Sequence, residues 1–225
     1  MLRAIVLDFN GVIADDEHIH FELLRDVMAP LGLDITQQDY LDKYIVYRDE
    51  EAFTEALKAA GREPAPGDVE RLCNEKRRRY INDALSRVQV FPGACDFVRA
   101  AARQYPLAIA SAAARPEIEA VLRHIGIRAH FNQIVAAEDV ARGKPEPDVY
   151  IEAVRRLALT APGIVASEVL AVEDTPGGIA SARAAGLRVA AVLNTFPAND
   201  VAAADIILEY GLKAEALDQI HQLLR

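Results

Sequence analysis

Cysteine is scarce in this sequence and tryptophan is absent: 225 residues include two cysteines and no tryptophan. Cys73 and Cys95 do not form a CxxC pair, so neither a zinc site nor a disulfide framework is indicated, and we interpret both as ordinary thiols. No apolar run approaches the ~20 residues that a membrane helix needs. The first residues, MLRAIVLDFN, turn acidic too early for a signal peptide. We therefore expect a soluble, cytoplasmic protein.

A surplus of positive charge is missing as well. The chain has 25 Lys and Arg residues against 34 Asp and Glu residues, which gives a net charge of −9. Nucleic-acid-binding domains normally have a basic patch, and anionic membrane surfaces attract basic segments, so neither partner is expected. An acidic protein can still bind phosphate through backbone amides and a single lysine. The 52% hydrophobic content is enough for one large domain, or for one domain with a small insert.

An alternation of strand and helix patterns runs through most of the chain. Residues 4–7 are a continuous apolar run, which is typical of a strand buried on both faces of a parallel sheet. After Phe91-Pro92-Gly93, further apolar runs alternate with helical patterns. The expected strands cover residues 106–111, 133–137, 169–174, 188–193 and 204–209, and the expected helices lie near 118–125, 149–157, 176–185 and 214–224. This order predicts an α/β fold with a doubly wound, Rossmann-like parallel sheet.

Residues 15–87 have a different composition. Charged residues and helical patterns dominate, no convincing strand is visible, and the one clear break is the loop GREPAPGD at residues 61–68. We interpret this stretch as an all-helical domain inserted after the first strand. The predicted organisation is an α/β core of residues 1–14 and 88–225, with a helical cap domain of residues 15–87 that closes over the active site.

Polar side chains follow several of the expected strands. Asp8, Ser111 and the pair Glu173-Asp174 stand at strand ends, and Lys144 lies in a later loop. Ligands bind beyond the carboxyl ends of the strands in open α/β sheets, so these side chains are candidates for a common site. Each one alone is more simply explained as a loop or helix-cap residue. Together they are the residue types that suit phosphate and a metal ion.

The chemistry of these side chains fits phosphoryl transfer. A phosphoryl group is negatively charged, so a carboxylate can attack it only where a cation and fixed donors offset the repulsion. Asp8 and Asp174 supply hard oxygen ligands for Mg²⁺. Lys144 adds a positive charge that can pair with Asp8 and with phosphate. Ser111 and the backbone amides around it can donate hydrogen bonds to phosphate oxygens.

Four segments, taken in order, resemble the four motifs of the haloacid dehalogenase superfamily. They are DFNGVI, the serine of IAS, GKPEPDVY and VEDTPGGIASARAAG. The FPG segment and the helical insert after the first motif resemble the beta-phosphoglucomutase-like subgroup of phosphatases and phosphomutases. The resemblance covers essentially the whole chain, and it implies a Mg²⁺-dependent hydrolase with a Rossmann-like core and a helical cap.

The resemblance also implies roles for individual residues. Asp8 would be the nucleophile, and Ser111, Ala112 and Lys144 would bind the phosphoryl group. Phosphomutases of the subgroup have further polar substrate contacts just after the serine, where residues 112–115 of this chain read AAAR. This departure favours a phosphatase over a phosphomutase.

Asn10 is the main departure from the family pattern. The resemblance implies a Mg²⁺ site made by Asp8, by Asp174 with help from Glu173, and by the backbone carbonyl of residue 10. Phosphatases and mutases of the family usually have a second aspartate there, which acts as general acid and base. An amide cannot exchange that proton at neutral pH, and such catalysis is typically worth ~10²–10⁴ in rate. Asn10 therefore predicts a slow enzyme, and three explanations stay open: a natural adaptation, an introduced change that traps a complex, or a protein that only binds.

Three residues of the helical segment are candidate substrate contacts. His20, Arg48 and Lys76 resemble, in location, polar residues that touch the substrate in the phosphomutase subgroup. For Arg48 and Lys76, which lie among other charged residues, a solvated helix face is an equally good interpretation.

The predicted function is that of a Mg²⁺-dependent phosphatase for a small phosphorylated metabolite such as a sugar phosphate. We expect a monomer that forms an aspartyl phosphate, slowed by Asn10. The alternatives are a phosphomutase of the beta-phosphoglucomutase type and a non-catalytic phosphometabolite-binding protein on the same fold. A phospho-acceptor receiver domain would need neither the insert nor the GKPEPD segment. A dinucleotide-binding oxidoreductase would need GxGxxG after its first strand, and DFNGVIADD lacks it.

Overall fold

Strand β1 (Ala4–Leu7) lies inside a six-stranded sheet in the computed structural model, which describes residues 1–45 and 47–223. The strand order is β5-β4-β1-β6-β7-β8, and every neighbouring pair is parallel. The other strands are β4 (Leu107–Ala110), β5 (Gln133–Val135), β6 (Val169–Glu173), β7 (Arg188–Val192) and β8 (Ile206–Leu208). The predicted parallel α/β sheet is therefore confirmed.

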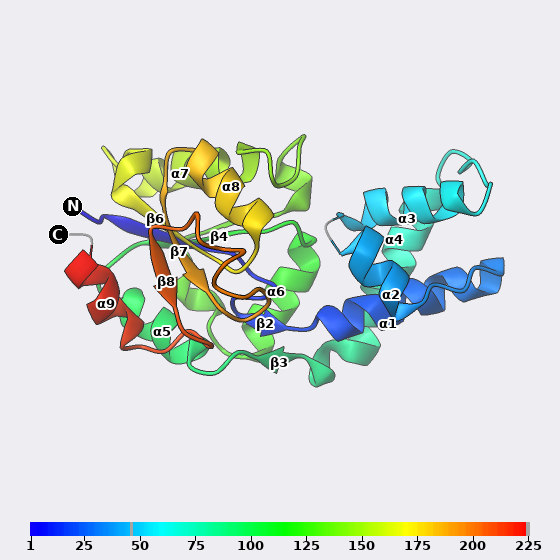
Figure 1. Cartoon of the computed structure of the whole chain (residues 1–225), viewed down its shortest axis with the longest axis horizontal. Coiled ribbons are helices and arrows are strands. Elements are labelled where there is room, and N and C mark those ends of the chain that lie inside the picture. Colours follow the sequence, from blue (N-terminus) through cyan, green and yellow to red (C-terminus); the bar gives the residue numbers. More distant parts are fainter. Residues whose placement is uncertain (46, 224–225) are drawn as a thin grey trace. The chain divides into compact units, whose positions relative to one another are not determined.

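Helices cover both faces of this sheet. Helices α7 (Asp148–Thr160) and α8 (Pro176–Ala184) lie on one face, and α5 (Ala94–Ala101) and α9 (Ala216–Leu223) lie on the other (Figure 1). All four residues of β1 are fully buried as a result. A strand covered on both sides needs apolar side chains at every position, which explains why its sequence does not alternate with polar residues.

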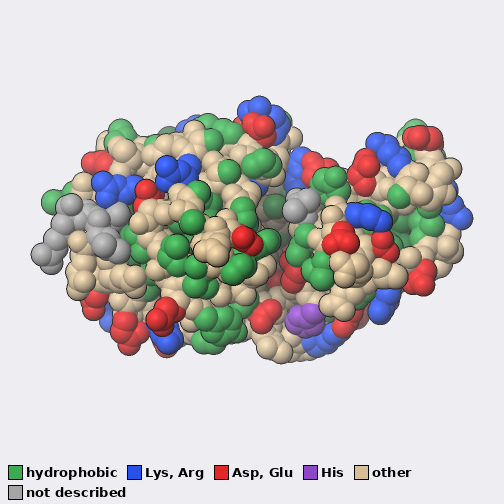
Figure 2. All heavy atoms as spheres, in the orientation of Figure 1, with side chains coloured by type: hydrophobic (Ala, Val, Ile, Leu, Met, Phe, Trp, Pro, Cys, Tyr) green, Lys and Arg blue, Asp and Glu red, His purple; other side chains and the backbone are tan. Residues whose placement is uncertain are grey.

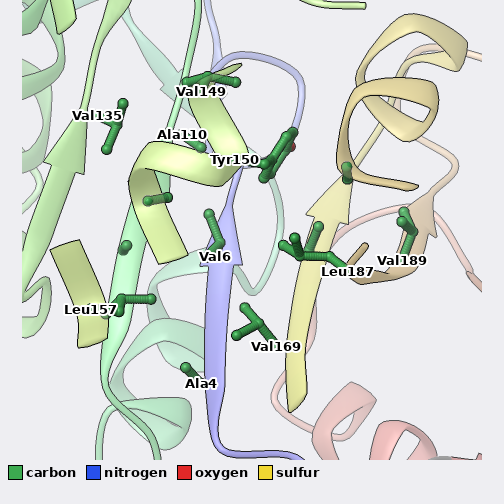
Figure 3. Packing of buried hydrophobic residues seen from close by; sticks show 14 of the residues in the cluster. Ala4, Val6, Ala110, Val135, Val149, Tyr150, Leu157, Val169, Leu187 and Val189 are labelled. Carbon is green, nitrogen blue, oxygen red and sulfur yellow. The ribbon is translucent and has the colours of Figure 1, made fainter. Parts of the chain in front are cut away.

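The core beneath α7 contains alternate residues of β1, β4, β6 and β7. Ala4 and Val6 of β1 and Val169 of β6 pack in one cluster with Val149 and Leu157 of α7 (Figure 3). Successive side chains of a strand point to opposite faces, so residues two apart share this cluster. Fully burying a Val or Leu side chain stabilises the fold by ~1.5–3 kcal/mol. The packing therefore holds the register that brings the strand ends together.

Local sequence signals set the ends of the helices that follow the functional strands. Helix α6 (Arg115–His124) has Pro116 in its first turn, and Gly126 follows it in a left-handed conformation. Helix α8 begins after Thr175, whose side-chain oxygen accepts a hydrogen bond from a backbone N–H of the first turn at 3.0 Å. Both sets of boundaries were predicted. The last helix was predicted to reach residue 224, which lies outside the described residues.

Two short strands were not predicted. Strands β2 (Ala14–Asp15) and β3 (Gln89–Val90) form an antiparallel pair, and the Phe91 amide extends it by donating to the Ile13 carbonyl at 3.0 Å. Each strand has two residues, too few for a recognisable periodicity. The pair joins the points at which the chain leaves and re-enters the α/β unit, which consists of Met1–Asp15 and Gln89–Arg225.

The second unit, Asp16–Val88, is helical in its described part, as predicted. Its helices are α1 (Glu17–Met28), α2 (Gln37–Asp39), α3 (Asp49–Ala59) and α4 (Asp68–Arg79), with π-helical turns at Tyr40–Tyr44 and Tyr80–Ala84. Leu24, Met28, Phe53 and Leu72 belong to a core of its own. The predicted boundaries of the cap, and its action over the active site, stay predictions.

Short 3₁₀ turns complete the element list. They lie at Ala29–Leu31, Leu85–Arg87, Arg128–His130, Ala137–Asp139 and Ala166–Glu168. On the face drawn in Figure 2, acidic and basic side chains are interspersed, in keeping with surface ion pairs such as Arg155–Glu152 at 2.6 Å. None of the helices in residues 1–45 and 47–223 has the length and apolar character needed to cross a membrane.

Candidate active site

Three neighbouring strands present polar residues at the same edge of the sheet. Asp8 directly follows β1, Ser111 directly follows β4, and Glu173 is the last residue of β6. These strands are adjacent in the order β4-β1-β6. Because the strands are parallel, their carboxyl ends meet at one edge, where open α/β sheets bind ligands. The structure therefore brings together the residues that the sequence predicted for the phosphoryl site.

Lys144 lies between two of these carboxylates. Its Nζ atom is 2.8 Å from Asp8 Oδ1 and 2.5 Å from Glu173 Oε1. The side chain of Lys144 is 12% exposed, and that of Glu173 is fully buried, so the pairing is shielded from water. This ammonium group offsets negative charge beside the candidate nucleophile.

Both carboxylate oxygens of Glu173 are occupied by contacts within the protein, one of which is the ion pair with Lys144. Its Oε1 atom also accepts a hydrogen bond from the hydroxyl of Tyr150 at 2.7 Å. Its Oε2 atom accepts from the backbone amides of Asp174 and Thr175 at 3.1 and 3.3 Å. Both oxygens are therefore engaged within the protein. The ring centroid of Tyr150 is 5.2 Å from Lys144 Nζ. Tyr150 was not predicted as a site residue, because in the sequence it is typical of an apolar side chain on the buried face of a helix.

The two carboxylate oxygens of Asp174 differ: one accepts a hydrogen bond from the protein and the other does not. The hydroxyl of Thr195 donates a hydrogen bond to Oδ2. The Oδ1 atom is buried and has no hydrogen-bond partner among residues 1–45 and 47–223. Gly11 packs so closely that a Cβ atom added there would lie 1.9 Å from Asp174 Oδ2. A buried carboxylate oxygen without a partner is unfavourable, which indicates that a cation belongs beside it.

The residues present fit a magnesium ion. Asp8, Glu173 and Asp174 each offer a carboxylate oxygen, and these three atoms lie within 4.8 Å of one another. Hard carboxylate oxygens are the ligands that Mg²⁺ prefers. Since the oxygens of Glu173 are already engaged, Asp8 and Asp174 are the carboxylates best suited to bind the ion directly.

The electrostatics of the ion-free cluster agree with this assignment. Burial raises the pKa of Asp8 to about 7, since the opposing effect of Lys144 is smaller and Glu173 adds to the rise. Burial and the neighbouring carboxylates Glu173 and Asp8 raise the pKa of Asp174 well above its usual range. Burial disfavours the charged lysine, but Asp8 and Glu173 outweigh it and raise the pKa of Lys144 above its ordinary value. A bound cation would favour the ionised carboxylates.

The loop after Ser111 can bind an anion through its backbone. The buried Ser111 Oγ accepts a hydrogen bond from the Ala113 amide at 3.0 Å. The amides of Ala112 and Ala114 make no hydrogen bond to any described residue. An oriented backbone N–H at a strand end is a suitable donor for a phosphate oxygen.

Two further residues of the site were missed in the sequence. Asn194 and Thr195 lie in the loop after β7. The Asn194 amide donates to the Gly11 carbonyl at 2.7 Å, and its Oδ1 accepts from the Gly211 amide at 2.8 Å. Thr195 holds Asp174. Short polar residues in a loop give no sequence signal that distinguishes such contacts from solvated positions.

Two of the predicted substrate contacts, His20 and Lys76, share a polar network within the helical unit. His20 Nδ1 is 2.8 Å from Lys76 Nζ, and Lys76 donates to Asp49 at 2.6 Å. An ammonium only donates, so Nδ1 accepts and the ring proton is on Nε2, which faces Asp16 at 3.4 Å. Lys76 is 2% exposed, so its interpretation as a solvated helix residue is wrong.

The predicted roles of four residues, Arg48, His20, Lys76 and Asn10, stay untested. Arg48 pairs with Glu51 of its own helix at 3.3 Å, and its contact with a substrate stays a prediction, as do those of His20 and Lys76. Asn10 lies two residues after Asp8 and bridges to Ala14. Its part in metal binding and in proton transfer also stays a prediction.

Comparison with known proteins gives a consistent family. Residues 5–192 match the family model described as haloacid dehalogenase-like hydrolase. Protein CbbY of Rhodobacter capsulatus is 31% identical over 212 residues, which cover 91% of each chain. Fructose-1-phosphate phosphatase YqaB of Escherichia coli (strain K12) is 30% identical over 185 residues, which cover 81% of this chain and 92% of that protein.

Solved structures agree. CbbY of Rhodobacter sphaeroides, solved in complex with phosphate and, as a mutant, with xylulose-(1,5)bisphosphate, is 28% identical. Its TM-score is 0.81, and the match covers 92% of this chain and 94% of that one. Beta-phosphoglucomutase of Clostridium difficile shares the fold, with a TM-score of 0.83, 18% identity, and coverage of 100% of this chain and 97% of that one.

Proposed function

The chain belongs to the haloacid dehalogenase-like hydrolase family, and from this premise we propose that it is a Mg²⁺-dependent phosphatase for a small sugar phosphate. The family and the catalytic edge of the sheet support a hydrolase of phosphate esters. The names of its relatives support sugar phosphates, because one is a fructose-1-phosphate phosphatase and another was solved with a ketose bisphosphate.

The observation that supports this function most strongly is the position of Lys144. Its ammonium lies 2.8 Å from Asp8, at the end of the strand next to the one that Ser111 follows. A carboxylate that attacks a phosphoryl group needs positive charge and fixed donors at that point. Lys144 supplies the charge, and Ser111 with the amide of Ala112 supplies donors. Glu173 and Tyr150 keep the lysine in place.

In the proposed reaction, Asp8 attacks the phosphorus of the substrate. A bond forms between an Asp8 carboxylate oxygen and phosphorus, and the bond to the sugar oxygen breaks, so that the sugar oxygen must take up a proton. With an amide at position 10, that proton comes from solvent water. A second water then attacks the phosphorus of the aspartyl phosphate, the bond between phosphorus and the Asp8 oxygen breaks, and the water's proton leaves with inorganic phosphate or passes to solvent, so that the Asp8 carboxylate is restored. In both steps Lys144, Ser111 and the Ala112 amide hold the equatorial oxygens of the phosphoryl group.

Asp8, Asp174 and the backbone carbonyl of Asn10 would hold the magnesium ion in this proposal. Bound there, Mg²⁺ would offset the repulsion between the nucleophile and the phosphoryl group. Glu173 acts as a positioning residue, since its two oxygens already bind Lys144, Tyr150 and backbone amides. Thr195 orients Asp174 so that its other oxygen is available.

Asn10 makes the proposed enzyme slow, because the side chain that would exchange the proton is an amide. The absence of an acid at position 10 is also compatible with the alternative function, a protein that binds phosphorylated metabolites without hydrolysing them. A phosphomutase is the less favoured enzyme, since Ala112, Ala113 and Ala114 provide no polar side chain for a second substrate orientation.

We further propose that the helical unit acts as a cap, and that His20, Arg48 and Lys76 contact the substrate. We also propose that the protein is monomeric and cytoplasmic.

The test is phosphate release from a panel of sugar monophosphates and bisphosphates. Each substrate is assayed with Mg²⁺ and with a chelator, in the wild-type protein and in Asp8→Asn. We expect release that requires Mg²⁺ and is lost in Asp8→Asn. Release that persists in the variant would contradict the proposed nucleophile. Tight binding of a sugar phosphate without release, in both the wild-type protein and Asn10→Asp, would support the binding protein instead.

A further inference from the structure

The phosphate-binding loop has almost no polar side chains of its own. Beyond Ser111, residues 112–114 are all alanine. Any contact they make with a phosphoryl group must therefore come from backbone amides. Amide donors stabilise a transition state only if they are held in position before the reaction. Alanine side chains cannot provide that restraint, so it has to come from elsewhere in the α/β unit.

The restraint begins with the chain segment that follows β5. The Ser111 amide donates to the Val135 carbonyl at 3.0 Å, and the Ala137 amide donates to the Ala113 carbonyl at 3.1 Å. The backbone amide of Arg115 then donates to the carboxylate of Glu138 at 3.2 Å. Alternate residues of the loop are thus bound to this segment, which continues the β4–β5 pairing past the end of both strands.

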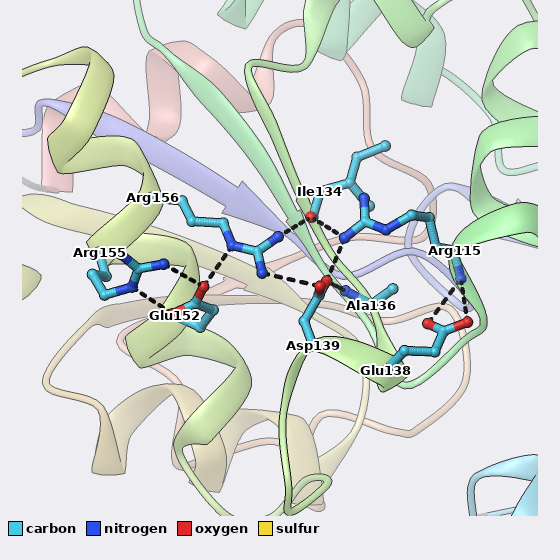
Figure 4. Close-up of polar contacts among 8 residues, drawn as sticks. All are labelled: Arg115, Ile134, Ala136, Glu138, Asp139, Glu152, Arg155 and Arg156. Atoms are coloured by element: carbon cyan, nitrogen blue, oxygen red, sulfur yellow. Dashed lines mark hydrogen bonds and ion pairs between the residues drawn. The ribbon is translucent and has the colours of Figure 1, made fainter.

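Two arginines and one aspartate hold this segment in turn (Figure 4). Arg115 Nη2 donates to the Ile134 carbonyl at 2.9 Å and to Asp139 Oδ2. Arg156 of α7 donates to the same Ile134 carbonyl at 3.0 Å and pairs with Asp139 Oδ1 at 3.0 Å. Asp139 therefore joins an arginine at the end of the loop to an arginine of the helix that packs on the sheet.

Both ends of this cluster are anchored. Arg156 Nε donates to Glu152, one turn earlier in α7, at 2.6 Å. Asp139 Oδ2 accepts from the Ala136 amide at 2.8 Å, and the Asp139 side chain is 18% exposed. Burial tends to raise the pKa of Asp139, but the hydrogen bonds and charges of Arg156, Ala136 and Arg115 outweigh it and lower that pKa. The aspartate is therefore a firmly ionised bridge at neutral pH.

From this arrangement we infer that Arg115, Asp139 and Arg156 are positioning residues for the phosphoryl group. They fix the backbone of residues 111–114 so that its amides face the phosphoryl site, and they do not touch the substrate. Arg115 is the one polar residue of the AAAR segment, the segment at which phosphomutases of the subgroup have further substrate contacts. Its guanidinium is instead bound to Ile134 and Asp139. The inference rests on the proposed function, since it concerns the binding of phosphate at that site.

The chain offers a matched control for Asp139. Glu119 of α6 also pairs with two arginines, Arg123 and Arg128, each at 2.9 Å. Its side chain is 18% exposed, the same fraction as that of Asp139. The hydrogen bonds and ion pairs of the Glu119 carboxylate go to these two arginines, and Arg115 adds only a weaker, longer-range charge interaction. Glu119→Gln therefore removes one carboxylate charge that faces two arginines, as Asp139→Asn does, and breaks no hydrogen bond or ion pair to the loop.

The experiment is titration calorimetry of inorganic phosphate and, separately, of Mg²⁺, in the wild-type protein, Asp139→Asn and Glu119→Gln. We expect Asp139→Asn to weaken phosphate binding by about 10-fold or more, because the amides lose their fixed position. Its Mg²⁺ affinity should stay at the wild-type value, since the carboxylate cluster is untouched. Glu119→Gln should bind both as the wild type does. Equal phosphate affinity in wild type and Asp139→Asn would overturn the inference, and so would a parallel loss of Mg²⁺ affinity.

A second variant and a second measurement cover the case in which Asp139→Asn does not fold. Arg156→Lys keeps the charge but cannot reach Ile134, Asp139 and Glu152 together, so it should also weaken phosphate binding. Hydrogen exchange of the Ala137 amide, which donates to the loop, should become faster in either variant. Unchanged exchange would contradict the positioning role of Arg115, Asp139 and Arg156. Absence of phosphate binding in the wild-type protein would instead overturn the proposed function, and this inference with it.

Discussion

The hydroxyl of Thr195 donates a hydrogen bond to Oδ2 of Asp174, while Oδ1 of the same carboxylate has no partner among residues 1–45 and 47–223. One oxygen is thus fixed by the loop after β7 and the other is presented for a ligand. In this carboxylate, one oxygen therefore sets the orientation of the group and the other is available to bind a ligand. This arrangement also gives Thr195, which no sequence pattern marks, a specific and measurable effect.

Thr195→Val should weaken Mg²⁺ binding by about 5-fold, the effect of losing one hydrogen bond of about 1 kcal/mol. The loss follows because Asp174 becomes free to rotate and must be ordered when the ion binds. Titration calorimetry measures it. Thr160→Val is the control, since the Thr160 hydroxyl donates to the Leu157 carbonyl of its own helix, and its loss should leave the affinity unchanged. Equal affinities in all three proteins would show that Thr195 does not orient Asp174.

Gly11→Ala should abolish Mg²⁺ binding. Gly11 has φ of +77°, and a Cβ atom there would lie 1.9 Å from Asp174 Oδ2, so the carboxylate would have to move. Gly126→Ala is a close control, because Gly126 has φ of +72° and open space around its Cβ position. Both variants bear the cost of a left-handed alanine, about 1–2 kcal/mol. Only the first should lose the ion, and retention of wild-type affinity in Gly11→Ala would contradict the proposed metal site.

Tyr150→Phe should lower the free energy of unfolding by about 1 kcal/mol and reduce kcat more than KM. The variant removes the hydroxyl that donates to Glu173 at 2.7 Å, which loosens the group that holds Lys144. Denaturant unfolding and steady-state kinetics give the two quantities. Tyr105→Phe, which loses a contact of 2.7 Å with His221 away from the catalytic edge, should change stability but leave kcat alone. A Tyr150→Phe protein with unchanged kcat would rule out this role.

Mg²⁺ affinity should rise with pH up to about 7. In the ion-free protein the pKa of Asp8 is raised from its ordinary 3.8 to about 7, so the folded protein retains a proton that the ion must displace. Binding below pH 7 therefore releases a proton, and the affinity increases as that proton is lost to solution. Calorimetry at pH 6 in buffers of different ionisation enthalpy measures the release. A heat that is the same in every buffer would mean that Asp8 and Asp174, whose pKa is also raised, are both already ionised.

The strand-end residues could be predicted from the sequence because a change of character marks each of them. Asp8 follows an unbroken apolar run, and Ser111 and Asp174 follow similar runs, so their places at one edge come from the parallel sheet alone. Lys144 was a candidate for the same site because its charge suits phosphate, and the family resemblance supported it, although its loop does not directly follow a strand. The spacing of the motifs shows which residues lie at the carboxyl-end edge of the sheet, but it does not show which of their atoms are in contact.

The supporting contacts could not be predicted for the same reason. Tyr150 looks like a core residue of α7, and Thr195 like a loop residue, until the distances to Glu173 and Asp174 are known. Lys76 differs from these two: its charged neighbours in the sequence made a solvated face as good an interpretation as a substrate contact, whereas the helical unit buries its side chain against Asp49. Charge in the sequence reports the kind of partner that a side chain needs, and only the packing shows whether that partner is water or protein.

In the proposed mechanism, with a sugar phosphate as substrate and Asp8 as nucleophile, Asn10 makes the rate depend on the leaving group. Lys144, Ser111 and the carboxylates needed to phosphorylate Asp8 are present, but no acid at position 10 can protonate the sugar oxygen. Aryl and acyl phosphates, whose leaving groups need no proton, should therefore phosphorylate Asp8 faster than sugar phosphates do. Hydrolysis should then lag, because an amide cannot take a proton from water. We expect a burst of one leaving group per active site, followed by slow turnover.

Restoring the acid provides the decisive comparison. Asn10→Asp should raise steady-state turnover of an aryl phosphate by ~10²-fold or more, the usual worth of general acid–base help. Asn132→Asp is the control, because it adds the same charge to the α/β unit at an exposed asparagine whose side-chain oxygen accepts from the Leu107 amide, a bond that an aspartate keeps. Rapid-quench kinetics on the three proteins separates the burst from the later turnover. Equal steady-state rates would mean that Asn10 does not stand in the place of the missing acid, whereas no reaction in any of them would favour a protein that binds phosphorylated metabolites without turning them over.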